Sequence, residues 1–340
     1  MNLLEHIYLK GMLAKQKRMV AARKRLPYPV VSIGNLTVGG TGKTPAAIAL
    51  AEEAVRRGFA PIILTRGYRG KAQGPCFVSA GNKPLIGVRE AGDEPVLMAG
   101  RLPGVPVVKS PDRYAGGMFA LEHLAETPYA AQEIPRILFI LDDGFQHWKL
   151  ARDVDIVLID GTNPFGNRRL LPLGPLREQM SALSRAHLLV TTKKKNEPVE
   201  RELAAINSEA GLHHASYEME SLLSPEGARQ AIGLLSGKRV YAFSGIANPK
   251  SFRRTLESTG CAIKGFKEYP DHYAYRERDL LNLCRIAERA GCGFLITTEK
   301  DLVKCSAYKG ALPLYALAVS FVFDVGFFED VFERLLPKMS

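Results

Sequence analysis

Residues 31–45 read Val31-Ser-Ile-Gly-Asn-Leu-Thr-Val-Gly-Gly-Thr-Gly-Lys-Thr-Pro45. An apolar stretch runs into a glycine-rich turn and then into a helical pattern, which is the layout of a phosphate-binding loop. Glycines let backbone N–H groups close around phosphate oxygens, Lys43 can neutralise the β and γ phosphates, and the Thr44 hydroxyl can bind Mg²⁺. The predicted nucleotide-binding residues are Thr37, Val38, Gly39, Gly40, Thr41, Gly42, Lys43 and Thr44.

The loop departs from the usual G-x-x-x-x-G-K-[ST] pattern at one position. The first glycine of that pattern would be residue 37, which is Thr37, whereas Gly39 and Gly40 lie inside the loop. A turn that needs glycine only for steric reasons would not account for the Lys-Thr pair at the start of the helix. A dinucleotide-binding loop would need G-x-G-x-x-G, which is absent here. The pattern favours binding of a nucleoside triphosphate.

Length and composition set broad limits on the fold and its surroundings. A chain of 340 residues can form one large domain or two unequal ones. The five cysteines form no C-x-x-C pair and are odd in number, which argues against a disulfide framework and favours a reducing compartment. The seven histidines show no spacing typical of metal ligands. No feature points to an obligate protein partner.

The first 26 residues carry seven basic side chains and one acidic one, and so contribute +6 to the net charge of +11. Apolar residues recur beside them at helical spacing, namely Leu3, Leu4, Ile7, Tyr8, Met12 and Met19. This pattern predicts a basic amphipathic helix that can lie on an anionic membrane surface. Its apolar run is too short to span a bilayer and does not resemble a secretory signal.

Two alternatives for the N-terminal helix stay open at this stage. The helix could pack against its own domain and leave its lysines in solvent. It could also act as an arm that binds nucleic acid. The rest of the chain offers little of the interleaved aromatic and basic pattern that such binding uses, so no nucleic-acid partner is predicted.

Apolar strand patterns alternate with helical patterns along the first two thirds of the chain. Several strand patterns are continuous apolar runs, as expected for parallel strands covered on both faces. The pattern predicts an α/β fold like that of P-loop NTPases, with a doubly wound, mostly parallel sheet. The predicted strands are 29–33, 61–65, 105–109, 136–141, 153–160 and 186–192, and the predicted helices are 42–58, 94–101, 112–126 and 179–185.

The remaining third repeats the strand and helix theme on a smaller scale, after a segment of loop composition over 223–228. Strands are predicted over 239–244, 261–269, 294–298 and 314–323, and helices over 249–260 and 277–290. The sequence therefore predicts three parts: a basic membrane-associating helix over 1–26, a P-loop domain over 27–220 and a smaller α/β domain over 221–340.

Candidate catalytic groups follow the predicted strand 136–141. Asp142 and Asp143 end it, which is how P-loop proteins place a carboxylate near Mg²⁺. Gln146 and His147 come next. Because the carboxyl ends of parallel strands converge on one crevice, we expect these side chains to approach the phosphate-binding loop.

Asp93 and Glu94 form a second carboxylate pair, at the start of a predicted helix. Asp93 could simply cap that helix. It could instead be a general base that takes the proton from an attacking hydroxyl. Arg66, Arg69 and Arg113 could bind an anionic substrate or the transferred phosphoryl group, although each could equally be a solvated surface arginine.

A loop of eighteen residues, 161–178, separates two predicted strands. Loops of that length in compact domains tend to be functional or disordered, and its Pro, Gly and Leu content favours an ordered wall. Its leucines and arginines suit a ligand that is both apolar and anionic. The leucines could also simply fill the core beneath the loop.

Taken together, these stretches resemble the tetraacyldisaccharide 4'-kinases of lipid A biosynthesis. The resemblance spans almost the whole chain, and it includes the substitution of Thr37 for the first glycine. Beyond the loop 34–45, it rests on Thr65-Arg-Gly-Tyr68, Gly92-Asp-Glu-Pro95, Leu141-Asp-Asp-Gly-Phe-Gln-His147, Leu170-Leu-Pro-Leu-Gly-Pro-Leu-Arg-Glu178, Gly245-Ile-Ala-Asn-Pro249, Tyr269-Pro-Asp-His-Tyr273 and Thr298-Glu-Lys-Asp301.

The resemblance implies transfer of the γ-phosphate of ATP to the 4'-hydroxyl of a tetraacylated glucosamine disaccharide 1-phosphate, with Mg²⁺ as cofactor. The product would be lipid IV-A, made by a peripheral enzyme at the cytoplasmic face of the bacterial inner membrane. Such an acceptor keeps its acyl chains in lipid, which favours the membrane interpretation of residues 1–26.

The resemblance also implies roles for individual residues. Lys43 and Thr44 would serve phosphate and Mg²⁺, with Asp142 and Asp143 at the metal. Asp93 would act as base, partnered by His272 of the smaller domain, which requires the two domains to close over the substrate. The supporting active-site residues would be Glu94, Arg113, Gln146, His147 and Glu178.

Three other functions remain as alternatives. One is a P-loop kinase with a soluble acceptor. A nucleotide switch of the GTPase type would need Asn-Lys-x-Asp, whereas Thr298-Glu-Lys-Asp301 has Lys and Asp adjacent. A nucleic-acid-dependent ATPase would bind oligonucleotides with a steep dependence on salt.

Overall fold

The computed structural model describes residues 2–132 and 136–335. The chain divides into two compact units. Unit 1 comprises Met1–Ala91, Met98–Ser216 and Phe321–Ser340, and unit 2 comprises Gly92–Leu97 and Tyr217–Ser320. Residues 1, 133–135 and 336–340 belong to the three predicted parts of the chain but lie outside the described residues.

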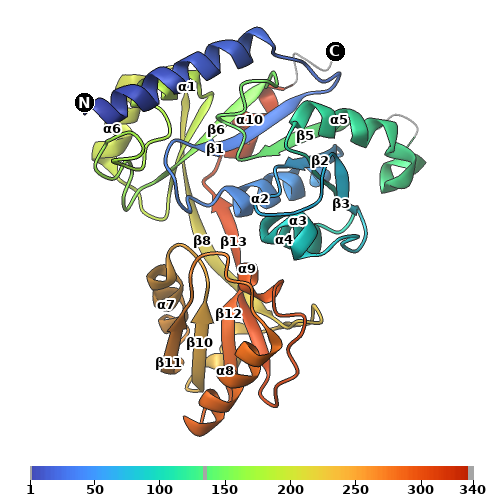
Figure 1. Ribbon diagram of the computed structural model, residues 1–340, viewed down its shortest axis with the longest axis vertical. Coiled ribbons are helices and arrows are strands. Elements are labelled where there is room, and N and C mark those ends of the chain that lie inside the picture. The colour runs from blue at the N-terminus through green and yellow to red at the C-terminus, as the bar shows by residue number, and fades with distance from the viewer. Residues whose placement is uncertain (1, 133–135, 336–340) are drawn as a thin grey trace. The chain divides into compact units, whose positions relative to one another are not determined.

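Unit 1 is built on a mostly parallel sheet with the strand order β8-β7-β6-β1-β5-β2-β4-β3 (Figure 1). The strand pairs described in it are parallel, except that β3 pairs with β4 in the antiparallel direction. This confirms the predicted fold class. The strands are β1 (Val30–Asn35), β2 (Ala60–Thr65), β3 (Cys76–Ala80), β4 (Pro106–Lys109), β5 (Ile137–Asp142), β6 (Val154–Asp160), β7 (Leu188–Thr192) and β8 (Gly211–Leu223).

Helices and 3-10 turns join these strands. They are α1 (Leu3–Ala21), α2 (Lys43–Arg56), α3 (Val88–Ala91), α4 (Asp93–Arg101), α5 (Arg113–Glu122), η1 (Leu124–Glu126), η2 (Pro128–Ala131), η3 (Met180–Arg185), α6 (Glu197–Ile206) and α10 (Phe327–Glu333). Three elements, α4, β8 and β13 (Leu314–Phe323), have residues in both units.

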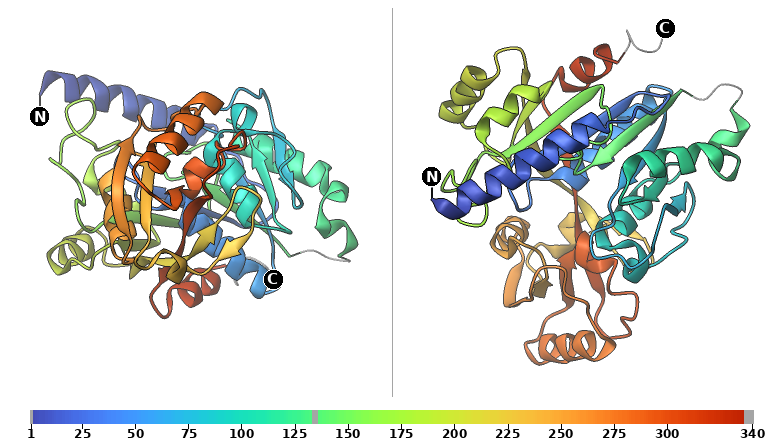
Figure 2. Two further views of the ribbon diagram at one scale, coloured as in Figure 1. Left: turned by 90° about the horizontal axis from the view of Figure 1, so that it is seen from below. Right: turned by 45° about the horizontal axis from the view of Figure 1, so that its top comes forward.

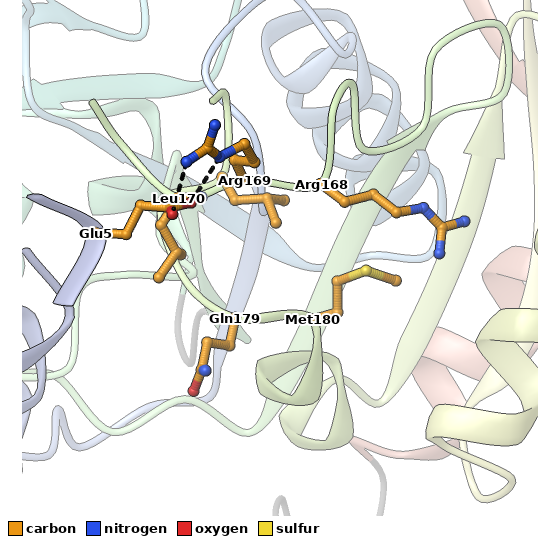
Figure 3. A pocket seen from close by; sticks show the side chains of 7 residues that line it. Glu5, Arg168, Arg169, Leu170, Gln179 and Met180 are labelled. Atoms are coloured by element: carbon orange, nitrogen blue, oxygen red, sulfur yellow. Dashed lines mark hydrogen bonds and ion pairs between the residues drawn. The ribbon is translucent and has the colours of Figure 1, made fainter. Parts of the chain in front are cut away.

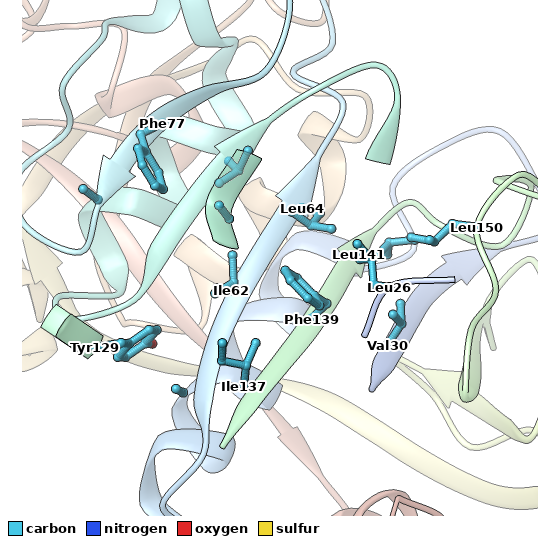
Figure 4. Packing of buried hydrophobic residues seen from close by; sticks show 14 residues of the cluster. Leu26, Val30, Ile62, Leu64, Phe77, Tyr129, Ile137, Phe139, Leu141 and Leu150 are labelled. Carbon is cyan, nitrogen blue, oxygen red and sulfur yellow. The ribbon is translucent and has the colours of Figure 1, made fainter. Parts of the chain in front are cut away.

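The central strands are buried along their whole length because the sheet is covered on both faces. Figure 4 shows one of the resulting cores, in which Ile62, Phe139 and Leu141 pack together. Partly buried residues of α5, such as Tyr114 and Met118, pack against this cluster. A second cluster joins apolar residues of β6, β7 and α6. Each buried Leu, Ile or Phe contributes about 1.5–3 kcal/mol, so these two layers hold the sheet rigid.

The strand register brings the predicted site residues to one edge of the sheet. β1 pairs with β5 so that Ile33 lies opposite Asp142, and it pairs with β6 so that Asn35 lies opposite Leu158. All three strands run in the same direction, so the loops that follow them leave from the same edge.

The helix α1 runs along the outer surface of unit 1 in each view (Figures 1 and 2). Its inward side carries Glu5, which is buried, and Tyr8, whose hydroxyl donates to the Arg177 carbonyl at 2.9 Å. Leu3, Leu4 and Ile7 are 73%, 50% and 60% exposed. The predicted apolar stripe is therefore split between a face that packs on the domain and a face that meets solvent.

Unit 2 has a smaller parallel sheet with the strand order β11-β10-β12-β13. One core cluster includes residues of α8 and a second includes residues of α7, so both faces of the sheet are covered. The further elements are β9 (Arg229–Gln230), η4 (Ile232–Leu235), β10 (Arg239–Ser244), α7 (Pro249–Glu257), β11 (Ala262–Glu268), α8 (Glu277–Arg289), β12 (Phe294–Thr298) and α9 (Glu299–Leu302).

Four features differ from the elements expected from the sequence. The edge strand β3 was not predicted, and the expected boundary at residue 220 lies inside β8. The segment 179–185 forms the 3-10 turn η3 instead of an α-helix, and the predicted helix 112–126 is interrupted between α5 and η1.

The division into units also differs from a single boundary at residue 220. The C-terminal helix α10 belongs to unit 1, where Phe332 packs on Phe59 with ring centroids 5.1 Å apart and Glu329 pairs with Arg57 at 2.8 Å. Residues 92–97 belong to unit 2. Proximity along the chain does not decide which core a short segment joins, because that choice depends on long-range side-chain packing.

Candidate functional site

The phosphate-binding loop joins β1 to α2 in unit 1. Gly42 caps α2 with a φ of 98°, and no side chain caps the helix, so the first N–H groups and the positive end of its dipole face the loop. Gly39 has a φ of 118°, and an added Cβ at Gly39 or Gly40 would meet no atom within 4 Å. The loop is therefore an open cradle lined by backbone groups, which suits phosphate.

The backbone conformation at Thr37 shows why the first glycine of the pattern is not needed here. It is not among the described residues with a positive φ, so its backbone has no need of glycine. Thr37 instead forms an antiparallel bridge with Leu176, and the Val38 N–H donates to the Pro175 carbonyl at 2.8 Å. The wall loop 161–178 thus supports the start of the phosphate-binding loop.

Lys43 spans the space between β1 and β5. Its Nζ donates to Asn35 Oδ1 at 3.2 Å and lies 3.7 Å from Asp143 Oδ1. Burial alone would raise the pKa of Asp143, but the charges of Lys43 and Arg177 outweigh burial and lower that pKa. Arg177 Nη1 contacts both carboxylate oxygens of Asp143, at 2.9 and 3.1 Å. Asp143 is therefore held as a carboxylate beside the loop.

Asp142 is buried and accepts a hydrogen bond from Thr65 Oγ1 at 3.3 Å, which joins the ends of β5 and β2. Arg113 is also buried, and its guanidinium lies within electrostatic range of the carboxylates of Asp142 and Asp143. Burial lowers the pKa of Arg113 to about 10, so the guanidinium stays charged at neutral pH. Its buried Nε has no hydrogen-bond partner among the described residues, as expected for a donor that an anionic ligand would satisfy.

A buried network supports these groups from behind. Glu178 is 1% exposed and accepts from Gln146 Nε2 at 3.1 Å and from Arg185 Nη2 at 2.9 Å. Gln146 in turn donates to the Asn35 carbonyl at 3.0 Å and accepts from Arg177 Nη1 at 3.3 Å. Glu178 and Gln146 therefore orient the arginine that pairs with Asp143.

Sequence reasoning missed one basic group at this edge. Lys193 follows β7, pairs with Asp160 at the end of β6, and donates to the Gly40 carbonyl of the phosphate-binding loop at 3.3 Å. The sequence pattern alone predicts no role for the charged run 193–195. Its position directly after an apolar strand is the signal that could have identified it, because parallel strands deliver their following loops to the same edge.

A second set of predicted residues lies in unit 2. His272 Nδ1 is 2.8 Å from Asp93 Oδ2, and the two side chains are only 13% and 5% exposed. Asp93 begins α4, where its Oδ1 accepts the Glu94 N–H at 3.0 Å. Glu94 also pairs with Lys300 Nζ at 3.1 Å. The structure thus brings Asp93, Glu94 and His272 together although 179 positions separate Asp93 from His272.

Asp301 organises the loops that carry this second set. It is fully buried and accepts from the Gly245 N–H at 3.0 Å and from the Tyr275 hydroxyl at 3.1 Å. The Gly245 carbonyl accepts the His272 N–H at 3.0 Å, which holds His272 at its positive φ of 61°. An added Cβ on Gly245 would lie 3.0 Å from the Tyr275 hydroxyl. The motifs around Gly245, His272 and Asp301 therefore meet at one carboxylate.

The predicted metal residues suit Mg²⁺ in a phosphate complex. Among the described residues no cluster of three or more His, Cys, Asp or Glu could hold a metal ion by itself. Mg²⁺ in nucleotide sites takes only one or two protein oxygens and completes its shell with phosphate and water. Thr44, Asp142 and Asp143 can supply such oxygens, with Asp143 held as a carboxylate.

A pocket of about 500 Å³ lies beside α1, with Glu5 and Arg169 at one end (Figure 3). Hydrogen bonding from Arg169 and from the Asn2 backbone lowers the pKa of Glu5 to about 2. Arg168, also on this pocket, pairs with both carboxylate oxygens of Glu202 at 2.8 Å. Both arginines already bind carboxylates, and these ion pairs join the wall loop to α1 and to α6.

In unit 1 the structure brings together Lys43, Asp143, Gln146 and Glu178 at the end of β1, through Asn35 and Arg177. Asp142 and Arg113 lie within electrostatic range of each other, and His147 lies within range of Arg113. In unit 2 it brings together Asp93, Glu94 and His272. Of the other predicted arginines, Arg66 lies within electrostatic range of Arg113 and Arg69 lies over the Tyr68 ring.

A phosphate cradle at the start of α2, with a carboxylate pair at the end of the neighbouring parallel strand, defines a P-loop kinase fold. The chain matches the family described as Tetraacyldisaccharide-1-P 4'-kinase over residues 2–337. The chain belongs to this family, which confirms the predicted resemblance.

Relatives support the assignment along most of the chain. A tetraacyldisaccharide 4'-kinase of Syntrophus aciditrophicus is 40% identical over 310 residues, which cover 87% of this chain and 80% of that protein. One from Anaeromyxobacter sp. strain Fw109-5 is 42% identical over 301 residues, covering 86% and 77%. The crystal structure of LpxK from Aquifex aeolicus in complex with ATP has a TM-score of 0.76 and 33% identity, and covers 98% of this chain and 97% of its own.

We expect His147→Asn to change how stability depends on pH. Burial, with the charge of Arg113, lowers the pKa of His147 to about 4, so the folded protein keeps the ring neutral. The unfolded chain takes up a proton below about pH 6.5, so the free energy of unfolding falls by up to about 3 kcal/mol between pH 6.5 and pH 4. In the asparagine variant this contribution is absent, so its free energy of unfolding should fall by correspondingly less over the same range. Urea unfolding followed by fluorescence of the neighbouring Trp148 measures the difference.

The control for this experiment is His6→Asn, which replaces an exposed histidine of α1 and should keep the wild-type dependence on pH. Parallel curves for wild type and His147→Asn would contradict the burial of a neutral His147.

Proposed function

We propose that the chain transfers the γ-phosphate of ATP to the 4'-hydroxyl of a tetraacylated glucosamine disaccharide 1-phosphate, giving lipid IV-A in lipid A biosynthesis. Family membership and the phosphate cradle support this reaction. The observation that supports a lipid as the substrate is an apolar groove that begins at α1 and reaches the phosphate-binding loop.

The groove has a volume of about 500 Å³. Its lining is mostly apolar and includes Tyr8, Met12, Val38, Trp148 and Leu171. Polar groups are few and sit at defined positions, as in sites that bind an apolar ligand with a polar head. They are Lys15, Gln146 and Arg177.

The groove is joined to the phosphate site by Arg177. Its side chain lines the groove and also pairs with Asp143 at 2.9 Å. Val38 belongs to the phosphate-binding loop and lines the same groove. An acyl chain in the groove would therefore bring its sugar head group toward the loop that holds ATP, which is the positioning that phosphoryl transfer needs.

The proposed nucleotide interactions use the groups at the sheet edge. The N-terminus of α2 and Lys43 would bind the phosphates, and Thr44 with Asp142 and Asp143 would hold Mg²⁺. When bound, Mg²⁺ supplies positive charge to the β and γ phosphates. Arg113 lies buried beside the two aspartates and would stabilise charge on the transferred group.

Asp93 is the proposed general base. The 4'-hydroxyl oxygen forms a bond to the γ-phosphorus, the bond from that phosphorus to the β–γ bridging oxygen breaks, and ADP leaves. The hydroxyl proton passes to Asp93, while His272 holds the carboxylate at 2.8 Å and orients it. Burial of both side chains keeps the pair aligned.

The purified chain, incubated with ATP, Mg²⁺ and the lipid disaccharide in detergent, should yield a lipid heavier by one phosphate group. Water-soluble sugars should give no such product. Lys43→Ala and Asp143→Ala should remain folded and lose at least about 100-fold in turnover, because each removes a charge at the phosphate site. Lys309→Ala, on an exposed lysine, is the matched control. Equal activity on soluble sugars would favour a soluble acceptor, and near-normal turnover of either variant would remove its assignment.

Asp93→Ala and His272→Ala should each lower kcat by about 100-fold or more with little change in the KM for ATP. The double variant should cost little more than the worse single variant, because the two side chains act as one unit. Steady-state kinetics of the three variants provide the measurement. If the increases in activation free energy of the two single variants added up exactly in the double variant, this would argue against a joint role.

The α1 helix is the proposed membrane-binding element. Leu3, Leu4 and Ile7 form an exposed apolar surface on its first two turns, and Lys10 and Lys15 are exposed further along it. Such a surface favours the interface of an anionic membrane. No helix in the part of the chain that the structure describes has the length and apolarity of a membrane span. We place the enzyme peripherally, at the cytoplasmic face of the inner membrane.

Replacing Leu3, Leu4 and Ile7 together by serine should lower partition onto anionic phospholipid vesicles at least tenfold, since each exposed side chain contributes about 1 kcal/mol or more to insertion. ATP affinity should not change. Sedimentation with vesicles measures the partition, and Leu85→Ser, on another exposed leucine of unit 1, is the control. Unchanged partition of the triple variant would leave α1 as a packing element only.

A further inference from the structure

Lys300 lies against the ring of His272 in unit 2. The two ring nitrogens of His272 face different partners: Nδ1 is 2.8 Å from Asp93 Oδ2, and Nε2 is 3.5 Å from Lys300 Nζ. Lys300 is held there by Glu94, whose Oε1 lies 3.1 Å from the same Nζ. Lys300 is the second residue of α9, which begins directly after β12, so the end of that strand sets where its backbone lies.

The chemistry of the two groups restricts where the imidazole proton sits. An ammonium group has three donors and no acceptor, so the Nε2 atom beside it must offer a lone pair. A neutral imidazole carries one proton, which is then on Nδ1 and is donated to Asp93. A carboxylate can accept this hydrogen bond.

The neighbouring charges on other elements do not reverse this preference. Asp271 Oδ2 lies 3.7 Å from Nε2, beyond hydrogen-bond distance, and Asp271 is itself 3.9 Å from Lys300 Nζ. On the far side, Lys304 Nζ is 3.9 Å from Asp93 Oδ2 and pairs with Asp301 at 2.8 Å. Lys300 is thus the nearest charged group to Nε2 among the described contacts.

Lys300 keeps its charge in this surrounding. Burial opposes the charge, but Glu94, Asp93 and Asp271 outweigh burial and raise the pKa of Lys300 above its ordinary value. The side chain is 21% exposed. An ammonium group therefore faces Nε2 at neutral pH.

We propose that Lys300 is a positioning residue that fixes His272 in the tautomer with its proton on Nδ1, and thereby holds the Asp93 carboxylate ready to accept the substrate proton. The catalytic consequence rests on the proposed function. The other tautomer would direct the Nδ1 lone pair at the Asp93 carboxylate, which repels it. Without Lys300 the ring is free to take a proton on Nε2, and the ion pair that results makes Asp93 a weaker base.

The tautomer is measured directly by ¹⁵N NMR of the full chain with labelled histidine, without any substrate. His272→Gln identifies the resonances of this ring among the seven histidines. In wild type we expect a protonated Nδ1 and an unprotonated Nε2. Lys300→Met should move Nε2 toward the protonated form, whereas Lys300→Arg, which keeps the charge, should resemble wild type.

Two further variants serve as controls for the spectra. Lys309→Met removes an exposed lysine and should leave the His272 resonances unchanged. Asp271→Asn removes the carboxylate that competes for Nε2 and should keep the proton on Nδ1. A protonated Nε2 in wild type, or a His272 spectrum that Lys300→Met does not change, would overturn the proposal.

Kinetics connect the tautomer to the reaction. Lys300→Met should lower kcat by roughly tenfold or more while the KM for ATP changes little, and Lys300→Arg should recover most of the loss. The two proposals fail separately. Full activity of Asp93→Ala would remove the proposed base and leave the NMR result standing, whereas an unchanged tautomer in Lys300→Met would remove the role of Lys300 alone.

Discussion

The parallel pairing of β1 with β5 and β6 is the constraint on which the nucleotide site depends. Ile33 lies opposite Asp142 in this register, so the phosphate-binding loop and the carboxylate pair leave the sheet at the same level. A slip of one residue would turn every side chain of a strand to the other face. The fully buried strands prevent such a slip, because each side chain must fit a closed core.

Buried carboxylates then arrange the loops in each unit. In unit 1, Glu178 holds Gln146 and Arg185, and Gln146 steadies the arginine that pairs with Asp143. In unit 2, Asp301 joins the loops that follow β10 and β12 and, through Gly245, sets the backbone of His272. A buried charge is tolerated only when it is paired and hydrogen-bonded, so these networks define one loop conformation in place of many.

The sequence predicted the elements that local pattern controls. Apolar runs followed by glycine, lysine and aspartate were enough to place the phosphate-binding loop, Asp142 and Asp143 at one sheet edge. The pairing of Asp93 with His272 came only from the family resemblance, because no local pattern links positions that far apart. Lys300 was missed for the same reason, because nothing in its local sequence shows that it will meet His272. Lys193 differs, because its position directly after an apolar strand is a local signal that was overlooked.

By itself, the sequence determined the fold class, the phosphate-binding loop and the family. Hydrophobic periodicity, glycine spacing and the order of the motifs are local features, which can be recognised along the chain without knowledge of long-range contacts. Only the tertiary structure decided that α10 returns to unit 1, that Asp93 and Glu94 join unit 2, and that Lys300 faces the His272 ring. These outcomes depend on packing and charge pairing between segments that are distant in the sequence. Such interactions form only in the folded molecule, so no single stretch of sequence determines them.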